Sequence, residues 1–298
     1  MDIKEYSGNM KIAVENILGE GYIVEEICVS KNNGVRLDAL VIRKDEINLS
    51  PTIYLKHYYE NYMDGESIKE GALRLVKTYY EVVPETNFDI DFFTEYENIR
   101  KGLAFKLISA ERNTDLLTDS PHVPFLDLEI VFYYSLDKNG MDGATILVRN
   151  KHMDLWGVST EDLMRDSMKN TPDHMPGRCR DMQSVLTKLY PGHEDELNDI
   201  NDMPLMYVVT NDKMVYGAAT MLYPGLIKSL SEKIGSDLYI IPSSVHELIV
   251  VPTGAIPDAD YLRDMIYQVN HSQLEPQDIL SDSLYFYDGM TEKISIAS

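Results

Sequence analysis

The chain has 298 residues, of which 27 are Lys or Arg and 49 are Asp or Glu, so its formal net charge is −22. So acidic a surface repels phosphate groups, which makes DNA, RNA and anionic membranes poor partners. Hydrophobic residues make up 44% of the chain and aromatic residues 9%, a composition that excludes a wholly disordered protein. The length suits one large domain or two modest ones.

The sequence also indicates a compartment. Met1–Tyr6 has no basic segment leading into an apolar one, so no secretory signal is visible. A membrane-spanning helix needs about 20 apolar residues, and no such run is present. Cys28 and Cys179 lie far apart and belong to no CxxC motif, which is typical of reduced thiols. We therefore predict a soluble cytoplasmic protein.

The first elements alternate helix and hairpin. Apolar residues at 3.6-residue spacing predict a helix over 10–18. Two β-branched runs, 22–29 and 35–42, flank an Asn-Gly pair, the strongest short signal for a β-hairpin. A helix follows over 54–63, and Ser67–Glu70 fits the capping box that begins the next helix.

From residue 103 the spacing of apolar residues changes from a helical to a strand-like period. We predict strands at 103–109, 125–134, 144–149, 205–210 and 215–221, a loop at 170–180 and a helix at 181–190.

The last part continues in the same manner. We predict helices at 226–234 and after Asp258, and strands at 238–241, 248–251, 284–286 and 294–296. This order predicts an α+β fold of mostly antiparallel sheets, with helices packed on one side.

Two lobes follow from this order of elements. The predicted division is an N-terminal lobe (1–169), an acidic connection (170–203) and a C-terminal lobe (204–298), with one integrated domain as the alternative. Residues 1–203 carry 22 basic and 37 acidic side chains, and residues 204–298 carry 5 and 12. The acidity is therefore spread along the chain and is not an appended tail.

Motifs for cofactors and metals are missing. The sequence has no GxxxxGK[ST] loop and no GxGxxG after a strand, so nucleotide binding has no support. His246-Glu247 begins like the HExxH zinc motif, but Val250 stands where the second His must be. We predict neither a cofactor nor a metal site.

Ser243, Ser244 and His246 place hydroxyls beside an imidazole. One interpretation is a nucleophile with its base; the other is capping of a turn after Pro242. No GxSxG elbow is present, and closeness in sequence does not establish catalytic geometry.

Asp127 and Glu129 would share one face of a strand, as metal-binding carboxylates do. The metal-dependent nucleases that use such a pair also need a lysine two residues later, where this chain has Val131. The alternative interpretation is a solvated strand face.

Ligand or interaction residues form a further set of candidates. His122, Asn150, Trp156 and Asn211 lie at the ends of predicted strands, where side chains either bind ligands or cap the chain. Tyr58, Tyr59 and Tyr62 lie on a helix rich in tyrosine, a residue common both in cores and at protein interfaces.

Longer strings resemble a known family. They include Lys31–Val35, Ser50–Leu55, Pro121–Leu128, Leu222–Gly225 and Ile240–Glu247. With the matching strings between them they cover nearly the whole chain, which is similar to domain of unknown function 5688, a family of gut Clostridia and relatives. The resemblance implies one family-wide unit, and no activity, cofactor or catalytic residue comes with it.

Two functions remain open. The first is a non-catalytic binding or regulatory protein with an acidic, Tyr-rich surface and a basic protein as its partner. The second is a hydrolase or other small-molecule enzyme using Ser243, Ser244 and His246, or Asp127 and Glu129. Convergence of the candidate residues in one place would favour the enzyme. The sequence does not decide the oligomeric state.

Overall fold

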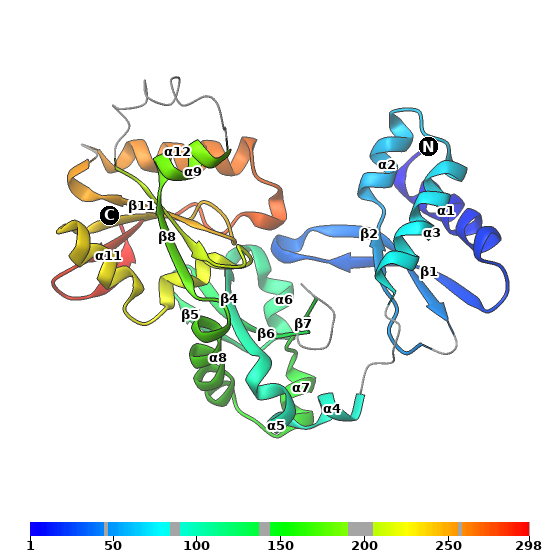
Figure 1. Cartoon of the computed structure of the whole chain (residues 1–298), viewed down its shortest axis with the longest axis horizontal. Helices are drawn as coiled ribbons and strands as arrows, with labels where there is room; N and C mark the ends of the chain where they lie inside the picture. Colours follow the sequence, from blue (N-terminus) through cyan, green and yellow to red (C-terminus); the bar gives the residue numbers. More distant parts are fainter. Residues whose placement is uncertain (45–46, 84–89, 137–143, 190–204, 256–257, 298) are drawn as a thin grey trace. The chain divides into compact units, whose positions relative to one another are not determined.

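The chain folds into two compact units, Met1–Phe93 and Thr94–Ser298. The computed structural model describes residues 1–44, 47–83, 90–136, 144–189, 205–255 and 258–297 (Figure 1). Each unit combines helices with antiparallel strands, so the predicted α+β class is confirmed.

The first unit is built from a three-stranded sheet and helices. Its elements are α1 (Ile3–Leu18), β1 (Tyr22–Ser30), η1 (Asn32–Gly34), β2 (Arg36–Lys44), β3 (Thr52–Tyr54), α2 (Lys56–Met63) and α3 (Ile68–Val82), and α4 (Ile90–Thr94) reaches the boundary. Tyr6 and Met10 of α1 pack with Leu75 of α3 against Leu40 and Ile42 of β2, and all five are fully buried. Apolar area removed from water is the main source of stability for such a unit.

Local signals fix the ends of these elements as predicted. The amide of Glu70 donates to Ser67 Oγ (3.3 Å) and the amide of Ser67 donates to Glu70 Oε2 (3.0 Å), which completes the capping box of α3. The predicted hairpin is also confirmed, with β1 and β2 paired from Tyr22↔Lys44 to Ser30↔Arg36. Asn33 (φ 58°) turns the chain between them.

The second unit contains two sheets. A four-stranded sheet is formed by β4 (Leu103–Ser109), β6 (Leu128–Ser135), β5 (His122–Phe125) and β7 (Thr145–Leu147). A six-stranded sheet has the order β13 (Lys293–Ile296), β12 (Tyr285–Asp288), β10 (Leu238–Ile241), β11 (Leu248–Pro252), β9 (Tyr207–Asn211) and β8 (Gly177–Asp181). The helices are α5 (Tyr96–Ile99), η2 (Arg100–Gly102), η3 (Glu111–Asn113), α6 (Thr114–Thr118), α7 (Asn150–Trp156), α8 (Thr160–His174), α9 (Met182–Leu189), η6 (Gly217–Leu222), α11 (Leu226–Ile234), η7 (Thr253–Ala255), α12 (Ala259–Ser272) and η8 (Pro276–Asp278).

A hydrophobic core lies against the six-stranded sheet. Leu262 and Ile266 of α12 pack against Ile241, Val251 and Leu284. Leu238, Ile240, Leu248 and Val250 alternate with these strand residues, so they point to the opposite face, and they too are fully buried. The sheet is therefore covered on both faces.

The boundary between the units differs from the one expected at 170–203. β8 lies inside that predicted connection, yet it pairs with β9 from Gly177↔Asn211 to Asp181↔Tyr207. The two segments belong to one sheet, and the division falls at Phe93–Thr94 instead. Residues 190–204, the most acidic part of the connection, lie outside the described residues.

Three predicted elements are wrong. The single strand expected at 125–134 is divided by a turn at 126–127 between β5 and β6. The loop expected at 170–180 is the end of α8 followed by the strand β8. Because β8 is an edge strand whose Arg178, Cys179 and Arg180 are exposed, its sequence lacks the apolar pattern that predicts a strand. The strand expected at 215–221 is the 3₁₀ helix η6, preceded by Tyr216 with φ 51°. A left-handed backbone of this kind cannot continue a strand.

Candidate functional site

The connection from β9 to η6 lies beside three of the polar candidates, Asn211, Ser244 and His246, and we call Asn211–Gly217 the 211–217 loop. Asn211 ends β9 and is 1% exposed. Its Nδ2 donates to the carbonyl oxygen of Val215 (2.7 Å), and its Oδ1 accepts from the amides of Lys213 (3.1 Å) and Val215 (3.3 Å). One buried amide side chain therefore holds the turn from inside.

The backbone of this loop is strained. Met214 (φ 54°) and Tyr216 (φ 51°) both adopt the left-handed conformation, which costs an L-residue other than Gly, Asn or Asp about 1–2 kcal/mol. A Cβ on Gly217 would overlap Thr210 Oγ1 and the carbonyl oxygen of His246, so only glycine fits there. Met214 is 66% exposed and Val215 is 41% exposed. The strained backbone therefore exposes two apolar side chains, Met214 and Val215, to solvent.

His246 supports the loop from the segment before β11. The amide of Tyr216 donates to His246 Nδ1 (3.2 Å), and the two rings stack at 5.8 Å with 13° between their planes. His246 Nε2 lies 3.5 Å from Asp278 Oδ1. The Tyr216 ring also contacts Tyr133 at 5.3 Å between centroids, and Lys106 Nζ lies 4.2 Å from its centre.

The hydroxyls near His246 serve the turn. Ser244 is 7% exposed; its Oγ accepts from the amide of His246 (3.0 Å) and its amide donates to the carbonyl of Glu247 (3.2 Å). The amide of Ser243 donates to the carbonyl of Ile241 (2.9 Å). Both ring nitrogens of His246 face groups other than these hydroxyls, so the arrangement is that of a capped turn and not of a nucleophile with its base.

Asp127 and Glu129 have separate environments. Asp127 Oδ2 accepts from Ser281 Oγ (2.6 Å), and its Oδ1 accepts from the Tyr285 hydroxyl (2.8 Å). Burial, with the Asp127 charge adding to it, holds the pKa of Tyr285 far above its usual range. Glu129 lies on β6, where burial raises the pKa of its carboxyl against the opposing effect of His122. Its Oε2 has no hydrogen-bond partner among the residues that the structure describes.

His122, Asn150 and Trp156 lie around α6 and α7. His122 Nδ1 is 2.8 Å from the carbonyl oxygen of Ser120, and Asn150 Nδ2 donates to the carbonyl of Thr118 (3.3 Å). The Trp156 ring, 8% exposed, lies 5.5 Å from His152 and 6.1 Å from Tyr96. Strand register places His122 and Lys106 on either side of Val131, on the sheet face that also carries Tyr133.

The three candidate tyrosines pack in the first unit. Tyr58 is 7% exposed and the Arg74 guanidinium lies 4.6 Å from its ring, while Tyr59 and Tyr62 lie 5.3 and 5.1 Å from Tyr6. Burial raises the pKa of Tyr6 to about 12. Tyr6 and Tyr58 belong to the core of the unit, and Tyr59 and Tyr62 are partly buried and pack against it. Among the tyrosines of α2 and α3 it is Tyr80 that is more than half exposed.

The structure thus brings Asn211, Ser244 and His246 together and keeps Asp127, Asn150 and Trp156 in other contacts. Sequence reasoning missed Lys106, Tyr133, Tyr216 and Asp278. The Asn-Asp pair that follows the β-branched run of β9 indicates a turn at this point of the sequence. Lys106, Tyr133 and Asp278 reach the turn only through strand register and the course of η8, which the sequence does not reveal.

Within the described ranges no three His, Cys, Asp or Glu side chains lie together as metal ligands would, and Cys28 and Cys179 are unpaired and exposed. No helix in the described part of the chain has the length and apolar character needed to cross a bilayer.

Comparison with known proteins adds a family and no function. A family model described as "Family of unknown function (DUF5688)" matches residues 3–289. No curated protein and no solved structure matches the chain.

Proposed function

Since the chain belongs to the DUF5688 family, whose function is unknown, we propose from its geometry that it is a non-catalytic binding protein of the cytoplasm. Its partner is a basic protein, and the 211–217 loop is the surface that contacts it.

The observation that supports this proposal is the exposed Met214–Val215 tip on a strained backbone. Bulky residues at positive φ persist only where the surroundings hold them, and such strain is concentrated at functional sites. Here Asn211, Gly217 and His246 hold the backbone. A preorganised apolar tip loses little conformational entropy when it inserts into a partner.

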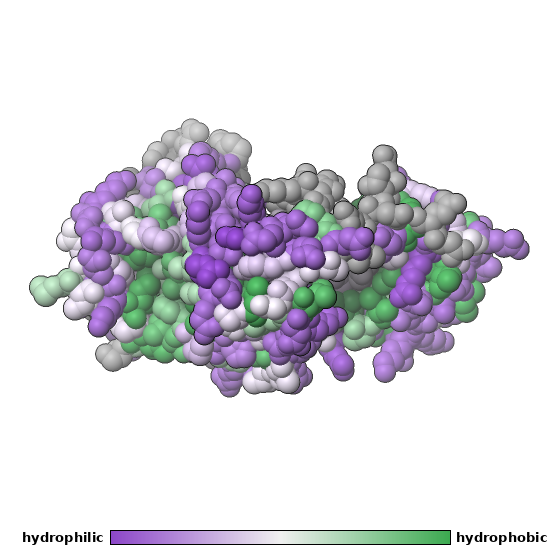
Figure 2. All heavy atoms as spheres, turned by 90° about the horizontal axis from the view of Figure 1, so that it is seen from below, coloured by the Kyte–Doolittle hydropathy of each residue, from purple (hydrophilic) through white to green (hydrophobic). Residues whose placement is uncertain are grey.

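Charge supports a cationic partner. The chain carries a net charge of −22, and the segments that meet at the loop include three carboxylates, Asp212, Glu247 and Asp278, and two lysines, Lys106 and Lys213. Hydrophilic residues cover much of the face drawn in Figure 2, with apolar patches between them. Opposite charges speed encounter and exclude partners of like charge, so an acidic surface selects basic proteins.

The test is salt-dependent capture by the tagged full chain from cells that express it. We expect the chain to retain basic proteins at 50 mM salt and to lose most of them at 300 mM. Met214→Asp should reduce capture at least tenfold, because it places a charge in the apolar contact. Recovery of no basic protein, or equal capture by the variant, contradicts the proposal.

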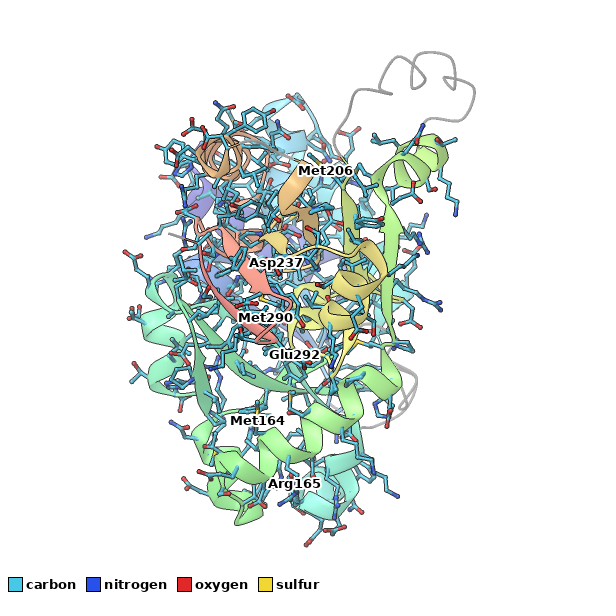
Figure 3. All side chains as sticks on the ribbon, turned by 90° about the vertical axis from the view of Figure 1, so that its left-hand side faces the viewer. Met164, Arg165, Met206, Asp237, Met290 and Glu292 are labelled. Atoms are coloured by element: carbon cyan, nitrogen blue, oxygen red, sulfur yellow. The ribbon has the colours of Figure 1, made fainter. Side chains whose placement is uncertain are left out.

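A matched control comes from another exposed methionine. Met290 is 93% exposed at the β12–β13 turn, where Figure 3 labels it beside Glu292. Asp237 Oδ1 accepts from the amide of Gly289 (2.8 Å), and Lys228 pairs with Glu292, so this turn is also well held. Met290→Asp makes the same chemical change elsewhere in the unit and should leave capture unchanged.

One observation favours the alternative, a hydrolase or other small-molecule enzyme. The raised pKa and unpartnered oxygen of Glu129 are properties of a general acid. A screen of ester, phosphoester and glycoside substrates tests this: turnover that Glu129→Gln abolishes without loss of stability would support it over the binding protein.

A further inference from the structure

We propose that His246 is a pH-sensitive latch on the 211–217 loop: protonation of its ring releases the backbone of Tyr216 and loosens the Met214–Val215 tip. The inference rests on the proposed function for what the tip does, and on local geometry alone for how the latch works.

The hydrogen bond to Tyr216 fixes the tautomer of the neutral ring. A backbone N–H can only donate, so His246 Nδ1 must offer its lone pair to the amide of Tyr216 at 3.2 Å. The proton of the neutral ring therefore sits on Nε2, which faces Asp278 Oδ1 at 3.5 Å. A second proton can go only to Nδ1, where it would meet the Tyr216 N–H head on.

Protonation consequently replaces a donor–acceptor pair with two facing donors. Histidine is the side chain that ordinarily changes charge between about pH 5 and 8. The bond to Tyr216 is then lost and its amide must find another acceptor or water.

The charges around the ring allow this outcome. Asp278 of η8 favours the imidazolium, whereas Lys106 of β4, held over the Tyr216 ring, opposes it. Asp212 and Lys213 on the loop, Glu247 after the ring and Glu129 of β6 are further charges on the segments that meet here. His246 and Asp278 side chains are 38% and 33% exposed, so the ring can keep its attraction to Asp278 while it moves off Tyr216.

Tyr216 is the residue that responds to this loss. Its φ of 51° is strained, and the bond to His246 is one of the contacts that hold it there. Without the bond the residue can relax to an ordinary φ, which withdraws its ring from Tyr133 and changes the direction of Val215 and Met214.

Hydrogen exchange by NMR on the full chain, with no partner present, tests the latch. We expect the protection factor of the Tyr216 amide to fall at least tenfold from pH 7.5 to pH 5.5. His246→Asn should hold it within twofold, because the Asn side-chain oxygen takes the place of Nδ1 and accepts the same bond without titrating. The amides of Ile240 and Val250, paired in β10 and β11, report on global stability.

Two further variants keep the test decisive. Asp278→Asn should move the pH midpoint of the loss of Tyr216 amide protection to lower pH by at least half a unit. This variant still tests the latch if His246→Asn fails to fold. His271→Asn, at a histidine of α12 whose Nδ1 lies 2.8 Å from the Tyr267 carbonyl oxygen, should change nothing. Constant protection in the native chain, an equal fall in His246→Asn, or an unmoved midpoint in Asp278→Asn overturns the latch. Because no partner is present, none of these results depends on the capture experiment.

Discussion

The β1–β2 hairpin and the 211–217 loop reverse the chain with the same left-handed backbone but with different residues. The hairpin places Asn33 (φ 58°) and Gly34 (φ 68°) at its turn, and both residue types accept positive φ at little cost. The loop has Met214 (φ 54°) and Tyr216 (φ 51°) in this conformation, and both residues are sterically strained by it.

The difference shows where each turn obtains its stability. The hairpin is local: its two strands pair over nine residues on each side, and the turn residues suit their conformation. The loop depends on groups from elsewhere in the sequence, namely His246 from the segment before β11 and the close approach of Thr210 to Gly217. Changes at the loop should therefore have larger effects than matched changes at the hairpin.

The largest effect is expected for Gly217→Ala. Its Cβ would overlap Thr210 Oγ1 and the backbone oxygen of His246, and only one of these belongs to a side chain that can move. We expect the free energy of unfolding, from urea titration, to fall by about 3 kcal/mol, as for overpacking against rigid neighbours. Gly34→Ala at the hairpin should cost about 1 kcal/mol, since the positive φ of this residue opposes the change. Equal losses at the two positions would remove the distinction between them.

The difference between turns held by neighbouring residues and turns held by distant ones also determines what could be predicted from the sequence. The hairpin, the capping box at Ser67 and the helix capped by Asp258 depend on residues close together in the chain, and the structure confirms them. The strand predicted at 215–221 failed because its β-branched and aromatic residues match a strand pattern locally, while Asn211 and His246 impose a turn.

The residues of the candidate site also divide into those that could be selected from the sequence and those that could not. Asn211, Ser244 and His246 could be selected as polar residues at strand ends, and they do lie together. Lys106, Tyr133 and Asp278 could not, because strand register and the course of η8 bring them to Tyr216 and His246. Asp127 illustrates the opposite error: its spacing from Glu129 suggests a metal pair, whereas Ser281 and Tyr285 bind both of its oxygens.

A smaller effect is expected for Asn211→Ala, which removes the inner support of the loop and leaves its backbone groups without their partner. The side chain is 1% exposed and makes three hydrogen bonds to Lys213 and Val215. Loss of buried partners costs about 1–3 kcal/mol, so we expect a fall of about 2 kcal/mol in the free energy of unfolding. Asn61→Ala on α2, whose amide reaches only the exposed ring of His57 at 3.3 Å, is the matched control and should stay within about 0.5 kcal/mol. A fall no larger than the control's would mean that Asn211 does not support the loop.

The smallest effect is expected for Met214→Asn, and its sign is opposite. Asn accepts a φ of 54° with less strain than Met, and at 66% exposure Met214 loses little burial when it is replaced. We expect the free energy of unfolding to rise by about 0.5 kcal/mol while capture of basic proteins falls, because the apolar tip is gone. Asn33→Met, the reverse exchange at the hairpin, should lower stability by about 1 kcal/mol. If Met214→Asn instead lowers stability, Met214 contributes packing that outweighs its strain, and its conformation would need no functional explanation.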